Sequence, residues 1–200
     1  MKIVVHGDEI SFNELTSKRQ YIEWIRVKNP AAFAEHSYAS AFFNIYDDAF
    51  LFNYDNLNAP VFINSVVHAA GGIKNITRIN GWKGFLEKDT WEAAGDINAK
   101  AKEILMTINK KIIFTKDEPG FISARIIAMI INEAYYAKEE EVSSEDEIDI
   151  AMKLGTNYPY GPFEWGRKIG LKNIYDLLIQ LSVQDKKYTP APLLVKLINP

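Results

Sequence analysis

Pro119 to Leu171 reads PGFISARIIAMIINEAYYAKEEEVSSEDEIDIAMKLGTNYPYGPFEWGRKIGL, and this stretch decides the fold of the chain. After the opening Pro-Gly-Phe, apolar residues recur every three or four positions, which is the period of a helix with one buried face. A second helix is predicted to begin at Ser144, because Ser144 and Glu147 match the Ser-x-x-Glu capping box that satisfies backbone N–H groups at a helix start. The stretch therefore predicts consecutive helices with defined ends.

The turn residues of this stretch predict where its helices stop and start again. Gly155 is expected to end the second helix in the left-handed conformation, which glycine adopts without steric cost. Pro162 suits the first position of a third helix, because no N–H partner is needed there, and that helix is predicted to close at Gly170. A generic helical bundle needs the helical period but not this series of turns.

In order and spacing, these residues resemble the C-terminal helical domain of the 3-hydroxyacyl-CoA dehydrogenases, a domain of the 6-phosphogluconate dehydrogenase C-terminal-like type. The matching segments are Lys116–Ile122, Asn132–Ala134, Glu147–Asp149, Ala151–Gly155, Pro159, Gly161–Glu164 and Ile169–Leu171. The resemblance implies two domains, a shortened Rossmann-like domain over residues 1–117 and an all-α domain for dimerisation and substrate binding over residues 118–200.

The resemblance also implies two partners, a second copy of the chain and an acyl-CoA. The family dimerises through its helical domain, and a symmetric dimer buries the same apolar patch on both copies. The residues that we expect to form this patch are Ile126, Ile127, Ile130, Ile131, Tyr135 and Tyr136.

Composition excludes several other classes of protein. The net charge of −3 argues against a surface for nucleic acid or for an anionic membrane, and no apolar run reaches membrane-spanning length. The chain has no cysteine, so it forms no disulfide, thiolate metal site or cysteine nucleophile. Together with a start that lacks the apolar core of a signal peptide, this fits a cytoplasmic protein.

The first half of the chain alternates strand and helix patterns. We expect strands over residues 2–6, 39–46, 61–63, 76–79 and 111–115, and helices over residues 12–25 and 90–108. This alternation predicts an α/β layer with a mainly parallel sheet. A complete dinucleotide fold needs about six strands, and βα units of roughly 30 residues leave too little chain before Val61 for that number. The domain is therefore predicted to be a truncated Rossmann-like domain.

The phosphate loop of the family is degenerate in this sequence. Glycines in a Gly-x-Gly-x-x-Gly turn let backbone amides approach a pyrophosphate at a helix start, and here the three positions hold Gly7, Glu9 and Phe12. The carboxylates of Asp8 and Glu9 would repel phosphate oxygens, and no acidic residue for the ribose follows a recognisable second strand. Gly7 is the remnant of the site, and we expect no bound cofactor although the family uses NAD.

The proton-transfer pair of the family is also incomplete. A His and a Glu twelve residues later carry this role in the family, and here the positions hold Asn80 and Glu92. An amide has no pKa near neutrality, so Asn80 can hydrogen-bond a carbonyl but cannot act as a general base. Base catalysis typically contributes about 10²–10⁴ in rate. Glu92 could act alone if burial raised its pKa, and otherwise it is a solvated or capping carboxylate.

Four more residues complete the candidate site. Asn64-Ser65 echoes an Asn-Thr-Ser stretch near the nicotinamide in the family, with Asn64 as a substrate-binding and Ser65 as a catalytic position. The Asn-Arg pair after Pro-Gly-Phe is reduced to Arg125, a substrate-binding position. His68 could replace the missing base, although a lone His near a strand end is more often structural. None of the three His has a partner at metal-ligand spacing, so no metal site is expected.

Two functions follow from these residues. The resemblance implies an oxidoreductase that converts 3-hydroxyacyl-CoA to 3-ketoacyl-CoA with NAD. Loss of the glycine loop and of the catalytic His favours a pseudoenzyme instead, a non-catalytic acyl-CoA-binding protein or a dimeric scaffold. The alternative is an active but divergent dehydrogenase that uses Glu92.

Overall fold

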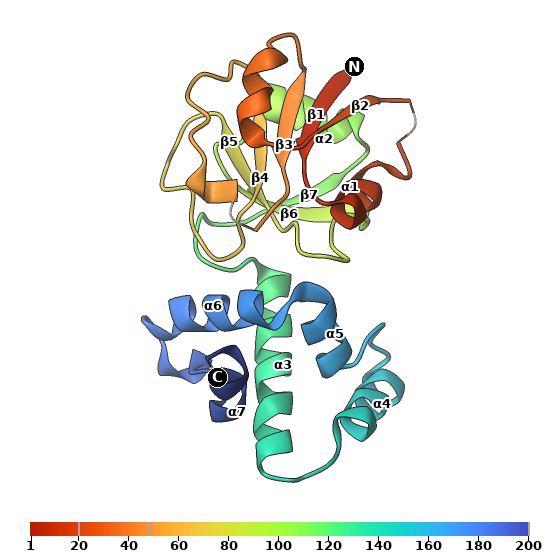
Figure 1. The fold of residues 1–200 in the computed structure, drawn as a ribbon, viewed down its shortest axis with the longest axis vertical. Helices are drawn as coiled ribbons and strands as arrows, with labels where there is room; N and C mark the ends of the chain where they lie inside the picture. The colour runs from red at the N-terminus through yellow and green to blue at the C-terminus, as the bar shows by residue number, and fades with distance from the viewer. Residues whose placement is uncertain (20, 48, 200) are drawn as a thin grey trace. The chain divides into compact units, whose positions relative to one another are not determined.

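A computed structural model describes residues 1–19, 21–47 and 49–199 (Figure 1). The chain forms two compact units, Met1–Phe121 and Ile122–Pro200, which are described one after the other. The predicted domain boundary after residue 117 falls in the segment that leads to the long helix beginning at Ile122. Among the described residues, no helix combines the length and the apolar character needed to cross a bilayer.

The first unit is built on a seven-stranded sheet with the order β2-β1-β3-β4-β5-β6-β7. Every neighbouring pair is parallel except β5 and β6, which confirms the predicted α/β fold with a mainly parallel sheet. The strands are β1 (Lys2–His6), β2 (Glu23–Val27), β3 (Ala41–Asn44), β4 (Val61–Asn64), β5 (Ile76–Ile79), β6 (Thr90–Gly95) and β7 (Lys111–Phe114).

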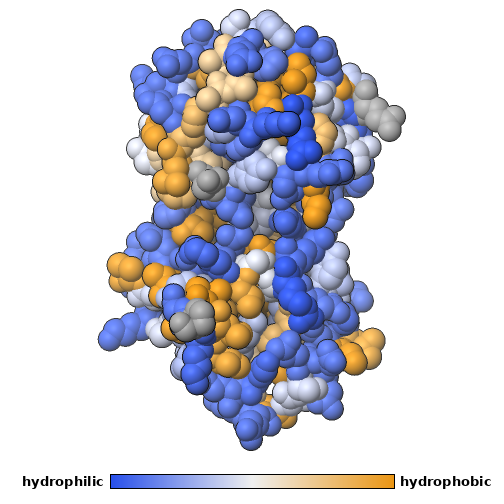
Figure 2. Space-filling model, in the orientation of Figure 1, coloured by the Kyte–Doolittle hydropathy of each residue, from blue (hydrophilic) through white to orange (hydrophobic). Residues whose placement is uncertain are grey.

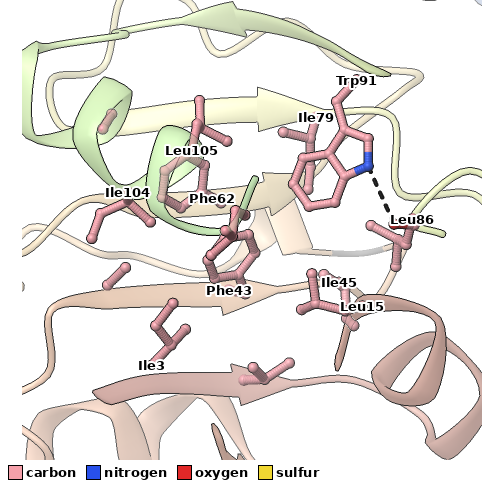
Figure 3. Packing of buried hydrophobic residues seen from close by; sticks show 14 of the residues in the cluster. Ile3, Leu15, Phe43, Ile45, Phe62, Ile79, Leu86, Trp91, Ile104 and Leu105 are labelled. Carbon is pink, nitrogen blue, oxygen red and sulfur yellow. Dashed lines mark hydrogen bonds between the residues drawn. The ribbon is translucent and has the colours of Figure 1, made fainter. Parts of the chain in front are cut away.

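Alternating side chains of the strands supply two cores, one on each face of the sheet. Helices α1 (Glu9–Thr16) and α2 (Ala99–Thr107) cover one face, where Phe43, Phe62 and Trp91 pack together (Figure 3). The opposite face is covered by the 3₁₀ helices η1 (Pro30–Glu35) and η2 (Ala49–Leu51) and by loops. Full burial of one such large apolar side chain contributes about 1.5–3 kcal/mol, so these clusters hold the sheet together.

The shortening of this unit falls on one strand and on the connecting helices. The order β2-β1-β3 keeps the reversal beside β1 that dinucleotide-binding sheets have. A complete fold has two strands beyond its first strand on this side, whereas here only β2 lies there. No α-helix joins β3 to β4 or β4 to β5 within the described residues. These short connections allow four strands to form before residue 65, more than the sequence led us to expect.

The predicted helix over residues 12–25 is wrong in its second half. Helix α1 ends at Thr16, and residues 23–27 form strand β2, which pairs with β1 in register from Lys2 and Glu23 onward. A short apolar run fits both a helix and a strand period, and pairing with a neighbouring strand decides between them.

The predicted helix over residues 90–108 is wrong in its first half for a related reason. Residues 90–95 form β6, which pairs with β5 and β7, and only residues 99–107 are helical. Two residues make the break between β6 and α2: Gly95 has a positive φ of 86°, and Asn98 caps α2 by accepting the N–H of Ala101 at 3.0 Å.

The second unit is helical, as predicted. Its elements are α3 (Ile122–Glu139), α4 (Glu145–Thr156), α5 (Pro162–Ile169), α6 (Leu171–Ser182), η3 (Lys186–Tyr188) and α7 (Pro192–Ile198). Helix α3 is central and contacts α5, α6 and α7. The buried amide of Asn132 donates to the carbonyl of Thr189 at 2.9 Å and accepts the N–H of Ala191 at 2.8 Å, so it fastens the segment before α7 to α3.

The ends of these helices follow the predicted turns with one exception. The Ser144–Glu147 capping box is present, and Pro162 is the first residue of α5. Gly155 does not end α4, because the helix continues to Thr156 and Asn157 takes the left-handed conformation with a φ of 56°. Asparagine is the second choice after glycine for the left-handed position, which therefore lies two residues after the predicted one.

A buried carboxylate explains why Gly161 precedes Pro162. Asp149 of α4 accepts the N–H groups of Phe163 at 2.8 Å and Glu164 at 3.1 Å, so it caps α5 from a different helix. A side chain on residue 161 would overlap the Asp149 carboxylate. The glycine therefore makes room for a cap that its own side chain cannot provide.

Candidate functional site

Most of the predicted site residues lie at one edge of the sheet. Gly7 follows β1, Asn64 and Ser65 stand at the end of β4, and Asn80 follows β5. In open α/β sheets ligands bind outside the carboxyl ends of parallel strands, and this is the edge concerned. Continuing the β5–β6 register by one residue beyond Ile79 and Ala93 sets Glu92 opposite Asn80. The register therefore brings the two family positions for proton transfer together.

The packing of the neighbouring strands leaves room only for a glycine at position 7. A Cβ atom at this position would overlap the side chain of Ile45, which follows β3. The carbonyl of Gly7 accepts a hydrogen bond from Nε of Arg26 at 3.0 Å. Both contacts hold the turn between β1 and α1 against the neighbouring strands. The presence of a glycine at this position is therefore explained by packing, without a ligand.

Asp8 occupies the helix start where a dinucleotide fold binds phosphate. It is the N-cap of α1, and its carboxylate accepts the N–H of Ser11 at 2.7 Å. Partial burial tends to raise the pKa of Asp8, but the hydrogen bonds from Ser11 and the ammonium of Lys83 at 3.5 Å outweigh it and hold this pKa below its ordinary value. The positive end of the helix dipole therefore already faces a carboxylate of the chain itself.

Asn64 and Ser65 join neighbouring loops at the end of β4. The Asn64 amide donates to Asp47 at 2.8 Å and accepts the N–H of Gly81 at 3.0 Å. The Ser65 hydroxyl donates to the carbonyl of His68 at 2.7 Å, and the His68 ring lies 3.9 Å from that of Phe50. Both predicted residues thus have structural partners, and His68 packs as an aromatic side chain.

Asn80 and Glu92 differ in their exposure. Asn80 is 3 % exposed, and its amide oxygen accepts the N–H of Trp82 at 3.3 Å. Glu92 is half-buried in β6. At residue 80 the site can therefore offer an amide hydrogen bond but no titratable group, and the carboxylate opposite is the candidate acid or base.

The sequence did not reveal the buried ion pair of Arg78 and Asp117, which lies next to this edge of the sheet. Nη1 of the fully buried Arg78 lies 2.6 Å from Asp117, and its Nε donates to the carbonyl of Ser65 at 2.9 Å. Asp117 also accepts the N–H groups of Ala70 and Gly71, both at 3.0 Å. An Arg in a strand pattern reads as a solvent-facing residue, so only the tertiary structure identifies this clamp.

The two groups of this pair shift each other's pKa. Burial lowers the pKa of the Arg78 guanidinium, and Asp117 opposes that shift. For Asp117, burial tends to raise the pKa, but the N–H of Ala70 and the Arg78 guanidinium outweigh it and leave the pKa below its ordinary value. The pair is therefore charged at neutral pH, and it holds the loop after β4 in place.

A second group that the sequence did not reveal lies between β1 and β3. Nδ1 of His6 is 2.9 Å from Oδ1 of the buried Asn44, and Nδ2 of Asn44 donates to the hydroxyl of Tyr54 at 2.8 Å. The ring of Tyr46 lies 4.4 Å from that of His6. No cluster of three or more potential metal ligands occurs in the part of the chain that the structure describes.

The helical unit carries Arg125 and a shallow polar hollow. Arg125 lies near the start of α3. The hollow, of about 640 Å³, lies beside α4 and α5 and is lined by Lys153, Pro159, Tyr160, Glu164, Arg167 and Lys168. Lys153 pairs with Glu164, and Arg167 lies 3.3 Å from Asp149. Lys153 and Arg167 of the hollow therefore already have carboxylate partners.

Comparison with known families matches the helical unit. Residues 120–200 match the model of the 3-hydroxyacyl-CoA dehydrogenase C-terminal domain. The 3-hydroxyadipyl-CoA dehydrogenase of Escherichia coli (strain K12) is 43 % identical over 97 residues, which are 48 % of this chain and 20 % of that protein. A 3-hydroxybutyryl-CoA dehydrogenase of Bradyrhizobium diazoefficiens is 40 % identical over 101 residues, 50 % of this chain and 34 % of that protein. The matched part of the chain thus spans 20 % and 34 % of these two relatives.

Solved structures match both units in fold. The 3-hydroxybutyryl-CoA dehydrogenase of Escherichia coli K12 superposes with a TM-score of 0.70 at 16 % identity, over 99 % of this chain and 56 % of that one. The (S)-3-hydroxybutyryl-CoA dehydrogenase PaaH1 of Ralstonia eutropha gives a TM-score of 0.66, also at 16 % identity, over 98 % and 93 %. At this identity the likeness concerns the fold, a Rossmann-like domain followed by a helical domain. The helical unit therefore matches the C-terminal domain of the 3-hydroxyacyl-CoA dehydrogenases in sequence.

Proposed function

We propose that this chain is a non-catalytic member of its family that binds an acyl-CoA thioester without NAD-dependent turnover. The observation that carries the proposal is the cap on α1, where the Asp8 carboxylate accepts the N–H of Ser11 at 2.7 Å. A pyrophosphate needs those amides and a site free of negative charge. Bringing a dinucleotide to this turn would require displacement of the cap and would set phosphate oxygens beside a carboxylate whose pKa is lowered.

Asn80 supports the same proposal from the chemical side. It stands at the family position of the catalytic His and is buried with its amide oxygen bonded to the N–H of Trp82. An amide can donate to a thioester or ketone oxygen but cannot take a proton from a hydroxyl. Binding of an acyl-CoA with a 3-keto group is therefore compatible with Asn80, whereas oxidation of a 3-hydroxyl group lacks its base.

One observation favours a second candidate, an active but divergent dehydrogenase. The strand register sets Glu92 opposite Asn80, so a carboxylate lies beside the position of the missing base. A carboxylate can serve as general base when its surroundings raise its pKa. This candidate still needs a bound nicotinamide cofactor, so it depends on NAD binding despite the capped helix start.

We also propose that the chain is a homodimer, but with a different surface from the one that the sequence indicated. Ile131 and Tyr135 of the expected patch are buried inside the helical unit, so they cannot face a partner. Helix α4 instead exposes 51 % of Ile150 and 82 % of Leu154. Apolar side chains reach the surface of this unit in several places on the face seen in Figure 2. A symmetric contact through α4 would remove such residues from water. A cytoplasmic location likewise stays a prediction.

Tryptophan fluorescence tests the proposal, because the chain contains four Trp residues. We expect acetoacetyl-CoA to change the emission saturably and NADH to leave it unchanged beyond the inner-filter correction. Saturable quenching by NADH would favour the divergent enzyme, and absorbance at the NADH band during incubation with 3-hydroxybutyryl-CoA and NAD would then detect turnover. A dimer by light scattering that responds to neither ligand would leave the scaffold role and exclude acyl-CoA binding.

A further inference from the structure

His6 and Asn44 end two adjacent parallel strands at the point where the strand order reverses. β1 pairs with β2 on one side and with β3 on the other, and the register sets His6 beside Asn44. After β1 the chain first forms β2 on one side of β1 and then crosses to form β3 on the other side. The loops that follow the two strands diverge at such a switch point, and open α/β sheets bind ligands there.

The hydrogen bonds around Asn44 determine which nitrogen of His6 carries the proton. Tyr54 donates its hydroxyl proton to the carbonyl of Ala49 at 2.6 Å, so its oxygen accepts from Nδ2 of Asn44 at 2.8 Å. Oδ1 of Asn44 then accepts the N–H of Tyr46 at 3.4 Å and faces Nδ1 of His6 at 2.9 Å. Because an amide oxygen only accepts, Nδ1 donates, and the neutral ring keeps its lone pair on Nε2.

Buried neighbours hold the His6 imidazole in this tautomer and orientation. Asn44 and Tyr54 are both buried, and the ring of Tyr46 lies 4.4 Å from that of His6, tilted by 48°. Within the described part of the chain, no hydrogen bond engages Nε2. His6 thus presents a hydrogen-bond acceptor of fixed orientation at the switch point, and its supporting groups are those of an oriented base.

The rest of the turn offers hydrogen-bond acceptors where a phosphate site needs donors. A phosphate site offers N–H donors, whereas here the Asp8 carboxylate accepts the N–H of Ser11 and His6 adds a second acceptor. The nearby cations have partners: Lys83 lies 3.5 Å from Asp8, and Nε of Arg26 donates to the carbonyl of Gly7. Such a site fits a neutral ligand that donates hydrogen bonds better than it fits an anion.

We propose that the β1–β3 switch point binds a small neutral molecule rich in hydroxyl groups, of the polyol or ribose class, and that Nε2 of His6 accepts the proton of one ligand hydroxyl. The inference goes beyond acyl-CoA binding and does not depend on it. It also differs from a dinucleotide site, because its ligand carries no phosphate at this turn.

Two measurements on the full chain test the proposal. Long-range ¹H–¹⁵N correlation of the labelled protein reads the tautomer, and we expect His6 to carry its proton on Nδ1. Diethyl pyrocarbonate reacts with a free imidazole nitrogen, and peptide mapping separates His6 from His36 and His68. We expect D-ribose to slow modification of His6, roughly to half at a ribose concentration equal to its Kd, and to leave His36 unchanged. Inorganic phosphate at equal ionic strength should protect neither.

Two variants separate the role of Asn44 from simple packing. Asn44→Leu removes the acceptor for Nδ1, so the single tautomer should give way to a mixture of both and protection by ribose should disappear. Tyr46→Leu keeps the backbone N–H and is the milder change, so it should fold and retain the Nδ1–H tautomer. A proton on Nε2 in the wild type, protection by phosphate, or no protection by ribose would each overturn the proposal.

Discussion

Arg78 and Asp117 form a buried ion pair at the end of β5, with Nη1 of Arg78 and Oδ1 of Asp117 2.6 Å apart. The guanidinium also donates to the carbonyls of Ser65 and Glu118, and its Cζ atom lies 5.0 Å from the ring centre of Phe121. One side chain in β5 thereby fixes both the loop after β4 and the segment after β7. The candidate site keeps its geometry because these two segments cannot move independently.

Removal of Asp117 should therefore destabilise the first unit. Breaking a buried pair on one side costs about 3–5 kcal/mol, because the remaining charge stays buried, and partial exposure of Asp117 places the expected loss for Asp117→Ala near the lower end. Urea unfolding measures the loss. Asp176→Ala, which breaks the exposed pair with Lys172, is the matched control and should change stability by less than about 0.5 kcal/mol. Equal losses in the two variants would contradict the clamp.

The same pair predicts an acid dependence. The pKa of Asp117 is lowered in the folded state, so its contribution is present above the pKa of the unfolded chain and is lost as the pH falls through the lower folded value. We expect the unfolding free energy of the wild type to fall more steeply below about pH 4 than that of Asp117→Asn. Parallel curves for the two proteins would show that the carboxylate does not stabilise the fold.

Lys110 predicts a dependence at alkaline pH. Burial lowers its pKa to about 7, and the neighbouring charge of Arg19 adds to the shift. Between pH 7 and the ordinary value of 10.5 the unfolded chain binds a proton that the folded chain has released, so stability should rise with pH in this window. The slope should reach on the order of 1 kcal/mol per pH unit.

Lys110→Met should flatten that slope, since it removes the titrating amine. It also removes the donor to the carbonyls of Leu86 and Lys88, so the variant should be less stable above pH 9 by about 1–3 kcal/mol. The exposed Lys100→Met is the control and should keep the wild-type slope. If Lys110→Met and the wild type show the same slope, Lys110 is charged in the folded protein throughout the window.

The helical unit was predictable because its signals are local. Ser144 and Glu147 cap each other across three residues, and Pro162 starts α5 wherever that segment packs. In the first unit the deciding contacts are distant in sequence. Residues 23–27 become a strand because β1 pairs with them, and Arg78 becomes buried because Asp117 arrives from the far end of the domain. Propensity cannot report either event.

The candidate site also contains residues that the sequence could predict and residues that it could not. The positions at Asn64, Ser65, Asn80 and Glu92 followed from the family resemblance, and the structure sets them at one edge of the sheet. The hydrogen bond between His6 and Asn44 was not, since it depends on the register of β1 against β3. A His at a strand end carries no sign of its partner, so its tautomer can be argued only from the folded chain.

Two glycines of the helical unit should respond oppositely to alanine. In Gly161→Ala the new methyl group would overlap the Asp149 carboxylate that caps α5, so we expect a loss of about 1–2 kcal/mol, the size of a lost helix cap. Gly155 lies inside α4 with open space around its Cα, so Gly155→Ala should raise stability by up to about 1 kcal/mol. Thermal unfolding compares the two directly, and a loss in both would mean that α4 and α5 do not pack as described.

Restoring the family His at position 80 should not restore dehydrogenase activity. Asn80→His supplies a base opposite Glu92, but the Asp8 cap still occupies the start of α1, where the proposed function excludes the pyrophosphate of NAD. We expect no NADH formation from 3-hydroxybutyryl-CoA and NAD with this variant, and none with the control Asn80→Gln. Because His is larger than Asn at this buried position, circular dichroism must first establish that both variants are folded. Hydride transfer by folded Asn80→His above the level of Asn80→Gln would mean that NAD binds despite Asp8, and the proposed non-catalytic role would then be wrong.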